Sequence, residues 1–509
     1  MGTTADKLNY LSNTKNLIKN AIVNKGQTVN SGDTFRSFAS KIENIQTGVD
    51  LNDYFRLTSV VGSYKALIKK FPENIILGTS MNNFFANWEA YTFPNVPNWD
   101  TSNVKYMDRI FFHVYQLKIA NLSNWNTSNV ISMNNAFSMC VALTSAPNWD
   151  TSNVTDMEGM FYNCWNLTSA PNWDTSKVID MGSMFYNCIN LVSVPNWNIP
   201  KVTNMCGMFR FCQKLTSIPD WNMPRVTNTA YMFSGCYNLT SAPNWNAPYI
   251  TSTFCMFEGC NNLISVPNWN MSRVTNMVSM FEGCNNLISV PNWDVSNVTY
   301  MGYMFSNCRN LTSIPNWNTP KATSMIGMFY NCKNLKEISN VKIFGSGTTI
   351  QNMFRQSGLE KISDTTFENI NNSQYAFIFA PLTNIFNVNF VNTNCQNFFS
   401  DCQNLTTVKI LNFSTISSAS YMFNGCYNLI DIFVPGSTNL LYISNMFKWC
   451  NNLSDASIQN IINMCLNSNN ISVKNIINTN IYSPFYYSNI ANTRYQNRWS
   501  ELAAAGWAY

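Results

Sequence analysis

Cysteine is the residue type whose spacing in this chain most suggests chemistry. Twelve of the sixteen cysteines stand three residues after a recurring phenylalanine, as Cys164 does after Phe161. Regularly placed thiols could bind metal or form disulfides. Zinc sites, however, require cysteines paired a few residues apart, and parallel side chains on stacked repeats fit disulfide geometry poorly. We therefore predict that this column consists of small, buried, apolar side chains.

Catalytic chemistry has few other candidates in the sequence. The single histidine is His113, so a Ser-His-Asp or Cys-His arrangement could form only around it. It occupies an ordinary repeat position beside Phe112, which favours a structural role. No phosphate loop, dinucleotide fingerprint or metal-ligand spacing is present. We expect no catalytic residue, no metal and no cofactor, and hence no enzyme.

Aspartate and asparagine form a further regular column, because one of them follows each recurring tryptophan. Asp150 and Asp174 are examples, and each precedes a Thr-Ser pair. A glycosidase needs two carboxylates in contrasting environments, which a uniform column does not supply. An Asp or Asn in this context is typical of a turn in which its side chain accepts a hydrogen bond from a backbone amide.

A 24-residue repeat explains why these residues form columns. Trp recurs in steps of 24 after a first step of 26, and a phenylalanine follows each Trp by twelve residues. A ladder of Trp rings could bind sugar faces, but we favour packing between neighbouring coils. The phenylalanine series extends the repeat to about sixteen units over residues 80–454. The Trp column comprises Trp99, Trp125, Trp149, Trp173, Trp197, Trp221, Trp245, Trp269, Trp293 and Trp317.

Each unit carries the pattern of short secondary-structure elements. Apolar residues at 157, 160, 161 and 164 have the i, i+3, i+4, i+7 spacing that predicts a helix of about two turns. The Asn-Leu-Thr-Ser segment 166–169 predicts a short strand that ends before Pro171, and residues 154–155 predict a second. A single unit cannot bury its apolar face, so units must stack, roughly 4.8 Å apart.

These elements predict an α/β repeat solenoid. We expect a right-handed, leucine-rich-repeat-like coil with short parallel strands and one short helix in each unit of about 24 residues. Residues 1–50 have the pattern of a small α-helical hairpin that serves particle attachment or oligomerisation, and 51–79 form a linker or N-terminal cap. Residues 455–509 leave the repeat and predict a C-terminal helical cap, whose first helix spans 457–466.

Some positions vary between units, and their side chains should point away from the buried stripe. Tyr, Trp and Arg at such positions are the types that supply contact energy at recognition surfaces. An unconstrained, solvated face explains the variation equally well. The candidate binding residues are Tyr162, Trp165, Tyr186, Arg210, Tyr231, Tyr237, Tyr303, Arg309 and Tyr330.

Composition excludes several classes of partner. Only 11% of the residues are charged, the net charge is +5, and no Lys/Arg run occurs, which disfavours nucleic acid. No apolar stretch approaches the roughly 18 residues of a membrane span. The segment Met1–Lys7 lacks the apolar core of a signal peptide, which predicts synthesis and initial retention in a cytoplasm.

The repeat resembles the BspA-like leucine-rich-repeat surface proteins of bacteria. The resemblance lies in the unit Cys-x-Asn-Leu-Thr-Ser-x-Pro-Asn-Trp-Asp-Thr-Ser-Asn-Val-Thr-x-Met-x-x-Met-Phe, and the run from Trp149 to Met160 is its most specific part. Members of that family are secreted or anchored adhesins. The opening of the chain, from Asp6–Leu11 through Asn16–Lys19 to Thr34–Phe38, is similar to N-terminal segments of phage tail and tail-fibre proteins.

Together the two resemblances imply a non-enzymatic receptor-binding component of a phage tail or phage-tail-like particle. Residues 1–50 would attach to tail structural proteins, and the solenoid would meet a host cell-surface glycan or protein. Such a component would be assembled in the bacterial cytoplasm and end on the virion. The alternatives are a BspA-like adhesin at the bacterial cell surface and an envelope polysaccharide depolymerase. Homo-oligomer formation stays open.

Overall fold

The structure is a computed structural model, and the chain divides into two compact units, Met1–Val226 and Thr227–Tyr509. Of the single residues described near the N-terminus, those between Lys15 and Val23 are helical. The remainder of the predicted hairpin and the predicted linker up to residue 76 lie outside the described residues. The structure describes residues 77–88, 99–117, 122–435, 439–440 and 442–466, and seven single residues between 15 and 29.

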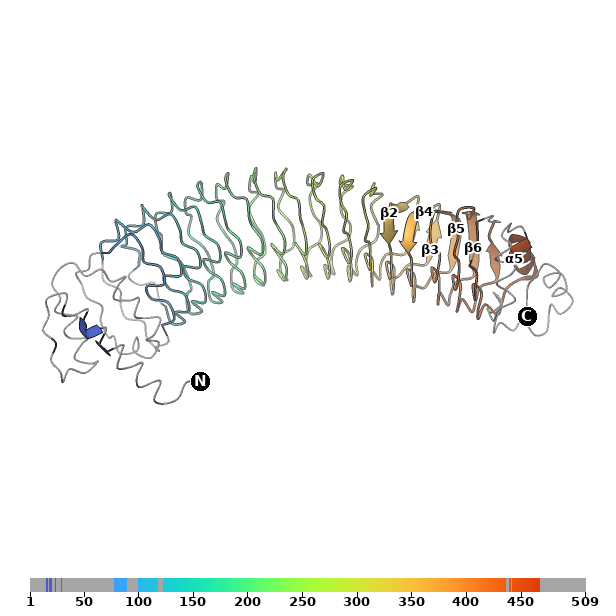
Figure 1. Ribbon diagram of the computed structural model, residues 1–509, viewed down its shortest axis with the longest axis horizontal. Coiled ribbons are helices and arrows are strands. Elements are labelled where there is room, and N and C mark those ends of the chain that lie inside the picture. Colours follow the sequence, from blue (N-terminus) through green and yellow to red (C-terminus); the bar gives the residue numbers. More distant parts are fainter. Residues whose placement is uncertain are drawn as a thin grey trace. The chain divides into compact units, whose positions relative to one another are not determined.

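Each unit is a stack of coils joined by parallel backbone hydrogen bonds (Figure 1). In the turn segment of each coil, alternate amides have different partners. The Phe161 amide donates to the Met184 carbonyl of the next coil at 2.8 Å, whereas the Cys164 amide donates to the Phe161 carbonyl of its own coil at 3.0 Å. In the second unit the Phe281 amide likewise donates to Met304, at 2.9 Å. The repeat-solenoid class predicted from the sequence is confirmed for each unit.

The predicted helix in each repeat is wrong. Residues 157–164 form consecutive turns, with positive φ at Gly159 and Asn163. An α-helix with its side chains is about 10 Å wide, whereas the rings of Phe161 and Phe185 on adjacent coils lie only 5.5 Å apart. Helices on every coil therefore cannot fit side by side. The tighter turn still buries the Met, Phe and Cys side chains whose spacing suggested a helix.

Aromatic columns fill the core of both units. Phe137 and Phe161 stack with ring centroids 5.4 Å apart, and Trp125 and Trp149 stack 6.0 Å apart. The Trp side chains are buried, which confirms their predicted packing role. Several of their indoles also donate to main-chain carbonyls, as Trp149 Nε1 does to that of Leu122 at 2.7 Å, whereas the indole nitrogens of Trp125, Trp221 and Trp317 are buried without a hydrogen-bond partner. The Trp column therefore offers no ring face to a ligand.

The cysteine column is buried beside these rings. Cys164 Sγ donates to the Phe137 carbonyl and Cys284 Sγ to the Phe257 carbonyl, each at 3.1 Å. Burial raises the pKa of both thiols far above the ordinary range, which leaves them protonated and unreactive. The cysteines that the structure describes are free thiols. The predicted role as small buried side chains is confirmed, and each thiol also caps a carbonyl.

Regular strands occur in the second unit, where coils 337–433 lengthen their extended segments (Figure 1). In one parallel ladder β1 pairs with β3, β3 with β5, β5 with β6 and β6 with β7. In the other, β2 pairs with β4 and β4 with the later half of β5. The strands are β1 Glu337–Ser339, β2 Lys342–Thr349, β3 Lys361–Ser363, β4 Thr366–Asn372, β5 Asn384–Val391, β6 Thr407–Asn412 and β7 Asp431–Phe433.

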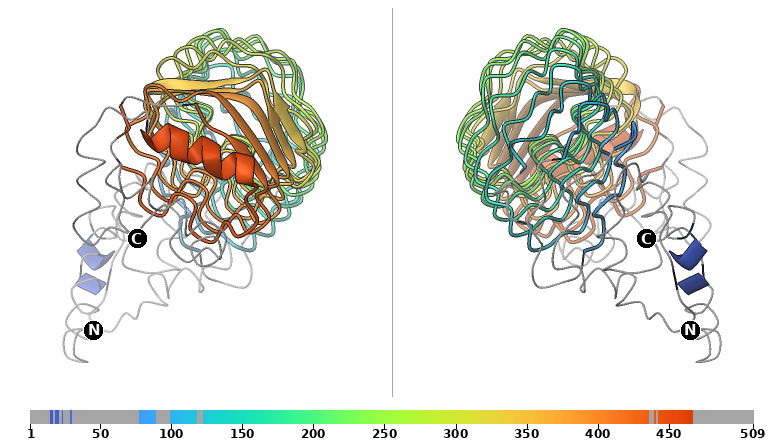
Figure 2. Two further views of the ribbon diagram at one scale, coloured as in Figure 1. Left: turned by 90° about the vertical axis from the view of Figure 1, so that its right-hand side faces the viewer. Right: turned by 90° about the vertical axis from the view of Figure 1, so that its left-hand side faces the viewer.

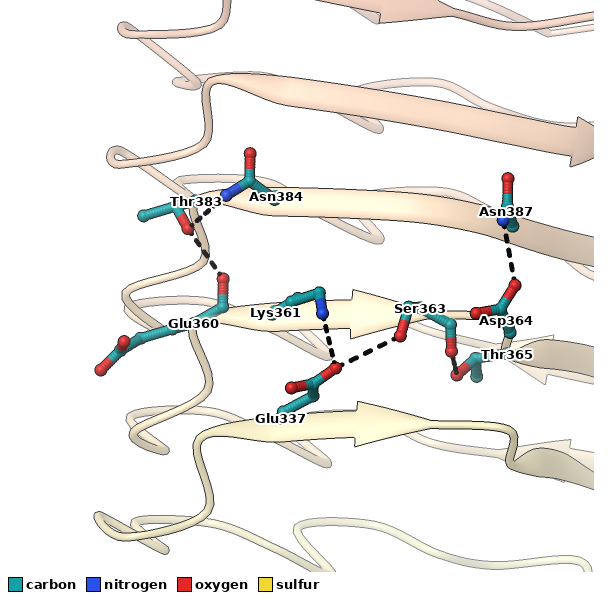
Figure 3. Close-up of polar contacts among 9 residues, drawn as sticks. All are labelled: Glu337, Glu360, Lys361, Ser363, Asp364, Thr365, Thr383, Asn384 and Asn387. Carbon is teal, nitrogen blue, oxygen red and sulfur yellow. Dashed lines mark hydrogen bonds and ion pairs between the residues drawn. The ribbon is translucent and has the colours of Figure 1, made fainter.

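Polar side chains on the outer surface of these strands pair with one another (Figure 3). Lys361 Nζ lies 2.8 Å from Glu337 Oε1, and Asn387 donates to Asp364 at 3.0 Å. The Lys361 and Glu337 side chains are almost half exposed, so this pair contributes at most about 1 kcal/mol. The opposite charges of Lys361 and Glu337 on neighbouring strands favour the observed register.

The helix α5, Asp455–Leu466, lies across the end of the second unit (Figure 2). It matches the helix predicted over 457–466. Two of its side chains accept hydrogen bonds from the exposed edge at β7. The Ile432 amide donates to Ser457 Oγ at 2.9 Å, and the Val434 amide donates to Asn460 Oδ1 at 2.8 Å. An edge strand would otherwise present these donors to another chain.

Thiol reactivity tests the buried cysteine column. In a Cys465→Ser protein at neutral pH, a soluble disulfide reagent should label Cys206 first, because Cys206 is partly exposed whereas the column thiols are buried with raised pKa. The column should react only after denaturation. Labelled peptides are identified by mass spectrometry. A Cys206→Ser variant is the control, and rapid native labelling of Cys188 would contradict the packing.

Candidate binding face

The outward side chains of the turn segment form one strip along each unit, which we call the turn face. Its positions are two residues before the repeat phenylalanine and one, two and four residues after it. Phe161 and Cys164 point into the core between these positions. Trp165, at the last position, is 47% exposed. In the coil of Phe161 the turn face comprises Gly159, Tyr162, Asn163 and Trp165.

Two turn-face positions adopt left-handed backbone in every described coil. These are the positions two residues before and two residues after the repeat phenylalanine, as at Gly159 and Asn163, where φ is 59°. Glycine avoids the steric penalty of this region, and asparagine tolerates it. The recurring glycines Gly159, Gly207 and Gly327 meet this backbone requirement, because φ there is 58–60°.

Aromatic residues occupy some of these left-handed positions although the backbone disfavours them there. A left-handed conformation costs such a residue roughly 1–2 kcal/mol, and strain of this kind concentrates at functional sites. Phe379 is 53% exposed and Tyr303 is 42% exposed, so burial does not explain them. The left-handed aromatic residues are His113, Phe211, Tyr231, Tyr303, Tyr375, Phe379, Tyr421 and Trp449.

Sequence reasoning selected Tyr231 and Tyr303 from this set and missed the others as binding candidates. A signal for them is present in the sequence. About half of these positions carry Gly or Asn, the residues that the backbone favours there, so an aromatic residue departs from that preference. That signal has meaning only once the columns are known to be left-handed, which a helical interpretation of the segment had hidden.

Three of the predicted binding residues meet in the first unit. The rings of Tyr162 and Tyr186 stack 4.5 Å apart at an interplanar angle of 11°. The Arg210 guanidinium lies 5.9 Å from the Tyr186 ring centroid and 5.0 Å from that of Phe211. Burial raises the pKa of Tyr162, and the neighbouring Tyr186 adds to the effect. Trp165 belongs to the same strip. This group combines aromatic rings with a cation.

A second cation–aromatic group lies in the coil of Phe111. The Arg109 guanidinium is 5.5 Å from the Phe112 ring centroid, and Phe112 stacks on His113 at 5.0 Å. His113 Nε2 lies 3.4 Å from the Tyr115 hydroxyl. His113 therefore has local partners, as its predicted structural role requires. It also lies on the turn face with φ of 64°, which the sequence did not indicate.

The predicted residues of the second unit are spread over three coils, those of Phe233, Phe305 and Phe329, rather than gathered in one cluster. Tyr231 meets Phe254 edge to face at 5.1 Å, and the Tyr330 hydroxyl donates to Gln356 Oε1 at 2.8 Å. The remaining three, Tyr237, Tyr303 and Arg309, are exposed on the turn face. All nine predicted residues are thus half-buried or exposed, as their outward orientation requires.

Several carboxylates of the first unit lie beside the turn face, at the positions three and five residues before the repeat phenylalanine. Asn134 Nδ2 donates to Asp156 Oδ2 at 3.3 Å and to Glu158 Oε2 at 3.1 Å. Burial raises the pKa of Asp156, and the charges of Asp180 and Asp108 act in the same direction, whereas hydrogen bonds from the Glu158 amide and Asn134 oppose them. The negative charge of these residues lies beside the turn-face positions but not on them.

The Asp column after Trp has the predicted turn chemistry. The Ser176 amide donates to Asp174 Oδ1 at 2.9 Å, and the Ser152 amide donates to Asp150 Oδ1 at the same distance. Hydrogen bonds from Ser176 lower the pKa of Asp174. Across the described residues, no three His, Cys, Asp or Glu side chains are grouped to hold a metal ion, and no helix there has the length and hydropathy of a membrane span.

Two family models match the repeat region. The family described as "Mycoplasma protein of unknown function, DUF285" matches residues 79–192, 166–265 and 251–369. The family described as "BspA type Leucine rich repeat region (6 copies)" matches residues 373–502. The resemblance of the repeats to BspA-type proteins is confirmed, whereas the N-terminal resemblance to phage tail proteins gains no support. No curated protein matches the chain.

Solved leucine-rich-repeat structures are also similar to this chain. A leucine-rich repeat protein from Eubacterium ventriosum ATCC 27560 is 16% identical, with a TM-score of 0.28, and the match covers 64% of this chain and 81% of that one. An internalin from Listeria monocytogenes str. 4b F2365 is 12% identical, with a TM-score of 0.21, and the match covers 71% of this chain and 78% of that one.

Backbone strain on the turn face predicts an unusual effect on stability. Phe379→Asn should raise the free energy of unfolding of the second unit by about 1 kcal/mol, because asparagine adopts the left-handed region more readily and the Phe379 ring is largely exposed. Urea unfolding followed by circular dichroism measures the change. Asn331→Phe, at the same position of another coil, should lower stability. A loss of stability in Phe379→Asn would disprove the strain.

The two kinds of carboxylate predict opposite pH effects. Because the folded-state pKa of Asp156 is raised, its ionisation destabilises the fold increasingly as pH rises from the unfolded pKa through the folded one. Asp156→Asn should therefore raise the melting temperature at pH 7 relative to the parent and lose that advantage near pH 3.

Asp174→Asn is the matched variant, and its effect on the melting temperature at pH 7 should have the opposite sign. The pKa of Asp174 is lowered, so its contribution is present above the unfolded pKa and disappears as pH falls through the folded one. Its removal should lower the melting temperature at pH 7, and that effect should shrink as pH falls below the ordinary Asp pKa toward the lowered folded one. Parallel pH profiles for the two variants would contradict both assignments.

Proposed function

The chain belongs, through residues 79–369, to the family described as "Mycoplasma protein of unknown function, DUF285", and we propose that it is a non-enzymatic binding protein displayed at a bacterial cell surface. The BspA-type match over 373–502 supports this adhesin-like function. The phage-tail component, which was the main function predicted from the sequence, rested on residues 1–50 and finds no support in either match, whereas the adhesin, the alternative, does.

The observation that carries the proposal is the set of aromatic residues held in left-handed backbone on the turn face. Phe379 and Trp449 are exposed there at positive φ. A fold that needed only stacking would place Gly or Asn at these positions. Exposed Tyr, Trp and Arg side chains on rigid coils provide contact area at low entropic cost. We infer that the turn face binds a cell-surface glycan or protein.

The proposal includes no catalytic step. The regular Asp residues are engaged in turns, as Asp174 is with Ser176. The column cysteines are buried with raised pKa, and His113 is held between Phe112 and Tyr115. These groups account for the candidate chemistry seen in the sequence, and each has a structural partner. A polysaccharide depolymerase is therefore not the function that the described residues favour.

A bead-adhesion assay tests the function. Beads coated with the full-length protein should bind cultured epithelial cells, and a Tyr186→Ser/Tyr303→Asn variant should bind about tenfold less, because one half-buried and one exposed aromatic side chain of the turn face are removed. Tyr249→Ser is the matched control, since Tyr249 is 45% exposed but lies off the turn face. Equal loss in both variants, or no adhesion by the parent protein, would refute the proposal. Antibody labelling of intact bacteria checks the surface location.

A further inference from the structure

We propose that the turn face of the Met1–Val226 unit binds an extended anionic glycan, a sugar chain that carries sulfate or carboxylate groups. This inference rests on the proposed binding function and specifies its ligand class. It draws on the two cation–aromatic groups around Arg109 and Arg210. The spacing of these groups along the coils and the absence of acidic residues between them supply the argument.

Charge on this part of the turn face has one sign. From the coil of Phe111 to that of Phe209, the turn-face positions contain no Asp or Glu, whereas Arg109 and Arg210 both lie on them. The nearest carboxylates, such as Asp156 and Glu158, lie beside the turn-face positions and accept hydrogen bonds from Asn134. A partner gains electrostatically from this arrangement only if it is anionic.

Aromatic rings hold the guanidinium of Arg210 in place. It lies over the Tyr186 and Phe211 rings, at 5.9 and 5.0 Å from their centroids, and these two rings meet edge to face at 5.7 Å. Contact with two nearly perpendicular rings restricts the positions that the guanidinium and its donors can take. A pre-oriented guanidinium suits the oxygen atoms of a sulfate or carboxylate group.

The arrangement of the tyrosines favours a glycan over a single-stranded nucleic acid. Bases bind by stacking on free ring faces. Tyr162 and Tyr186 instead turn their faces toward each other at 4.5 Å. Beside them, Asn187 Nδ2 donates to Asn163 Oδ1 at 2.8 Å in a ladder of amides. Ring edges, phenol hydroxyls and amides in a row match the hydroxyl groups of a sugar chain.

The distance between the two arginines sets the length of the ligand. Arg109 and Arg210 belong to coils four steps apart, which corresponds to roughly 19 Å at the strand spacing of a parallel stack. A disaccharide cannot span both groups, whereas an octasaccharide can. Binding through both sites raises the effective affinity of the longer chain without any new contact.

The second unit provides matched controls. Its turn face includes Glu258, Glu282 and Asp401, so an anionic chain would meet repulsion there. Arg273 lies 4.8 Å from the Tyr249 ring centroid, which reproduces the cation–aromatic contact away from the turn face. Arg273→Gln therefore removes the same chemistry and the same charge without touching the proposed site.

Surface plasmon resonance with full-length protein tests the inference. The probes are heparin and hyaluronan octasaccharides, a heparin disaccharide, neutral dextran, polyglutamate and a thymidine 20-mer. At least one anionic octasaccharide should bind more tightly than its disaccharide and than dextran. Arg109→Gln and Arg210→Gln should each weaken octasaccharide binding by about tenfold, the effect of losing one charge-assisted contact. Arg273→Gln should leave it unchanged, and Arg210→Lys should recover part of it.

Three outcomes would overturn the inference. These are no binding of either anionic octasaccharide, equal loss in Arg273→Gln and Arg210→Gln, or equally tight, arginine-dependent binding of polyglutamate or the thymidine 20-mer. Unchanged melting temperatures show that the variants fold. Cell adhesion of beads without glycan binding would reject the glycan while retaining the binding function. Glycan binding without cell adhesion would reject the proposed adhesive function instead.

Discussion

Hydrogen bonds between successive coils are the constraint on which the described structure depends. In the turn segment every second amide donates to the coil that follows, as Phe161 does to Met184 at 2.8 Å. These bonds require each coil to be one strand spacing thick. An α-helix is too wide for that spacing, so the chain reverses direction through turns. Such turns need left-handed backbone at two positions per coil, which explains the recurring Gly and Asn.

The same constraint accounts for the columns of Cys, Trp and Asp residues whose types suggested reactive or ligand-binding sites. Because alternate backbone amides donate to the next coil, some carbonyls and amides within each coil need other partners. Cysteine thiols, tryptophan indoles and aspartate carboxylates supply them, as Cys164 does for the Phe137 carbonyl, Trp173 for the Pro147 carbonyl and Asp174 for the Ser176 amide. Residue types that catalyse reactions elsewhere are repeated here because the backbone pattern is repeated.

The proposed binding function therefore depends on side chains that the stacking of coils does not require. Aromatic residues at left-handed positions oppose the preference of the backbone, and several of them are exposed, Phe379 among them. The two units differ in the charge around these residues, since Glu258 and Glu282 lie on the turn face of the second, whereas the coils of Phe111 to Phe209 in the first have no acidic residue at those positions. One fold can thus present different surfaces along its length by changing a few outward positions.

The sequence was sufficient for the repeat period, the buried columns, the solenoid class, the helix α5 and the outward orientation of residues such as Trp165, because these follow from spacing within a single unit. It failed on the helix at 157–164, since the i, i+3, i+4, i+7 pattern fits a turn that buries the same side chains equally well. The thickness of a coil decides between them, and that is a property of neighbours. For the same reason, the contact of Arg210 with Tyr186, 24 residues away, and the strain at Phe211 emerge only when coils are stacked.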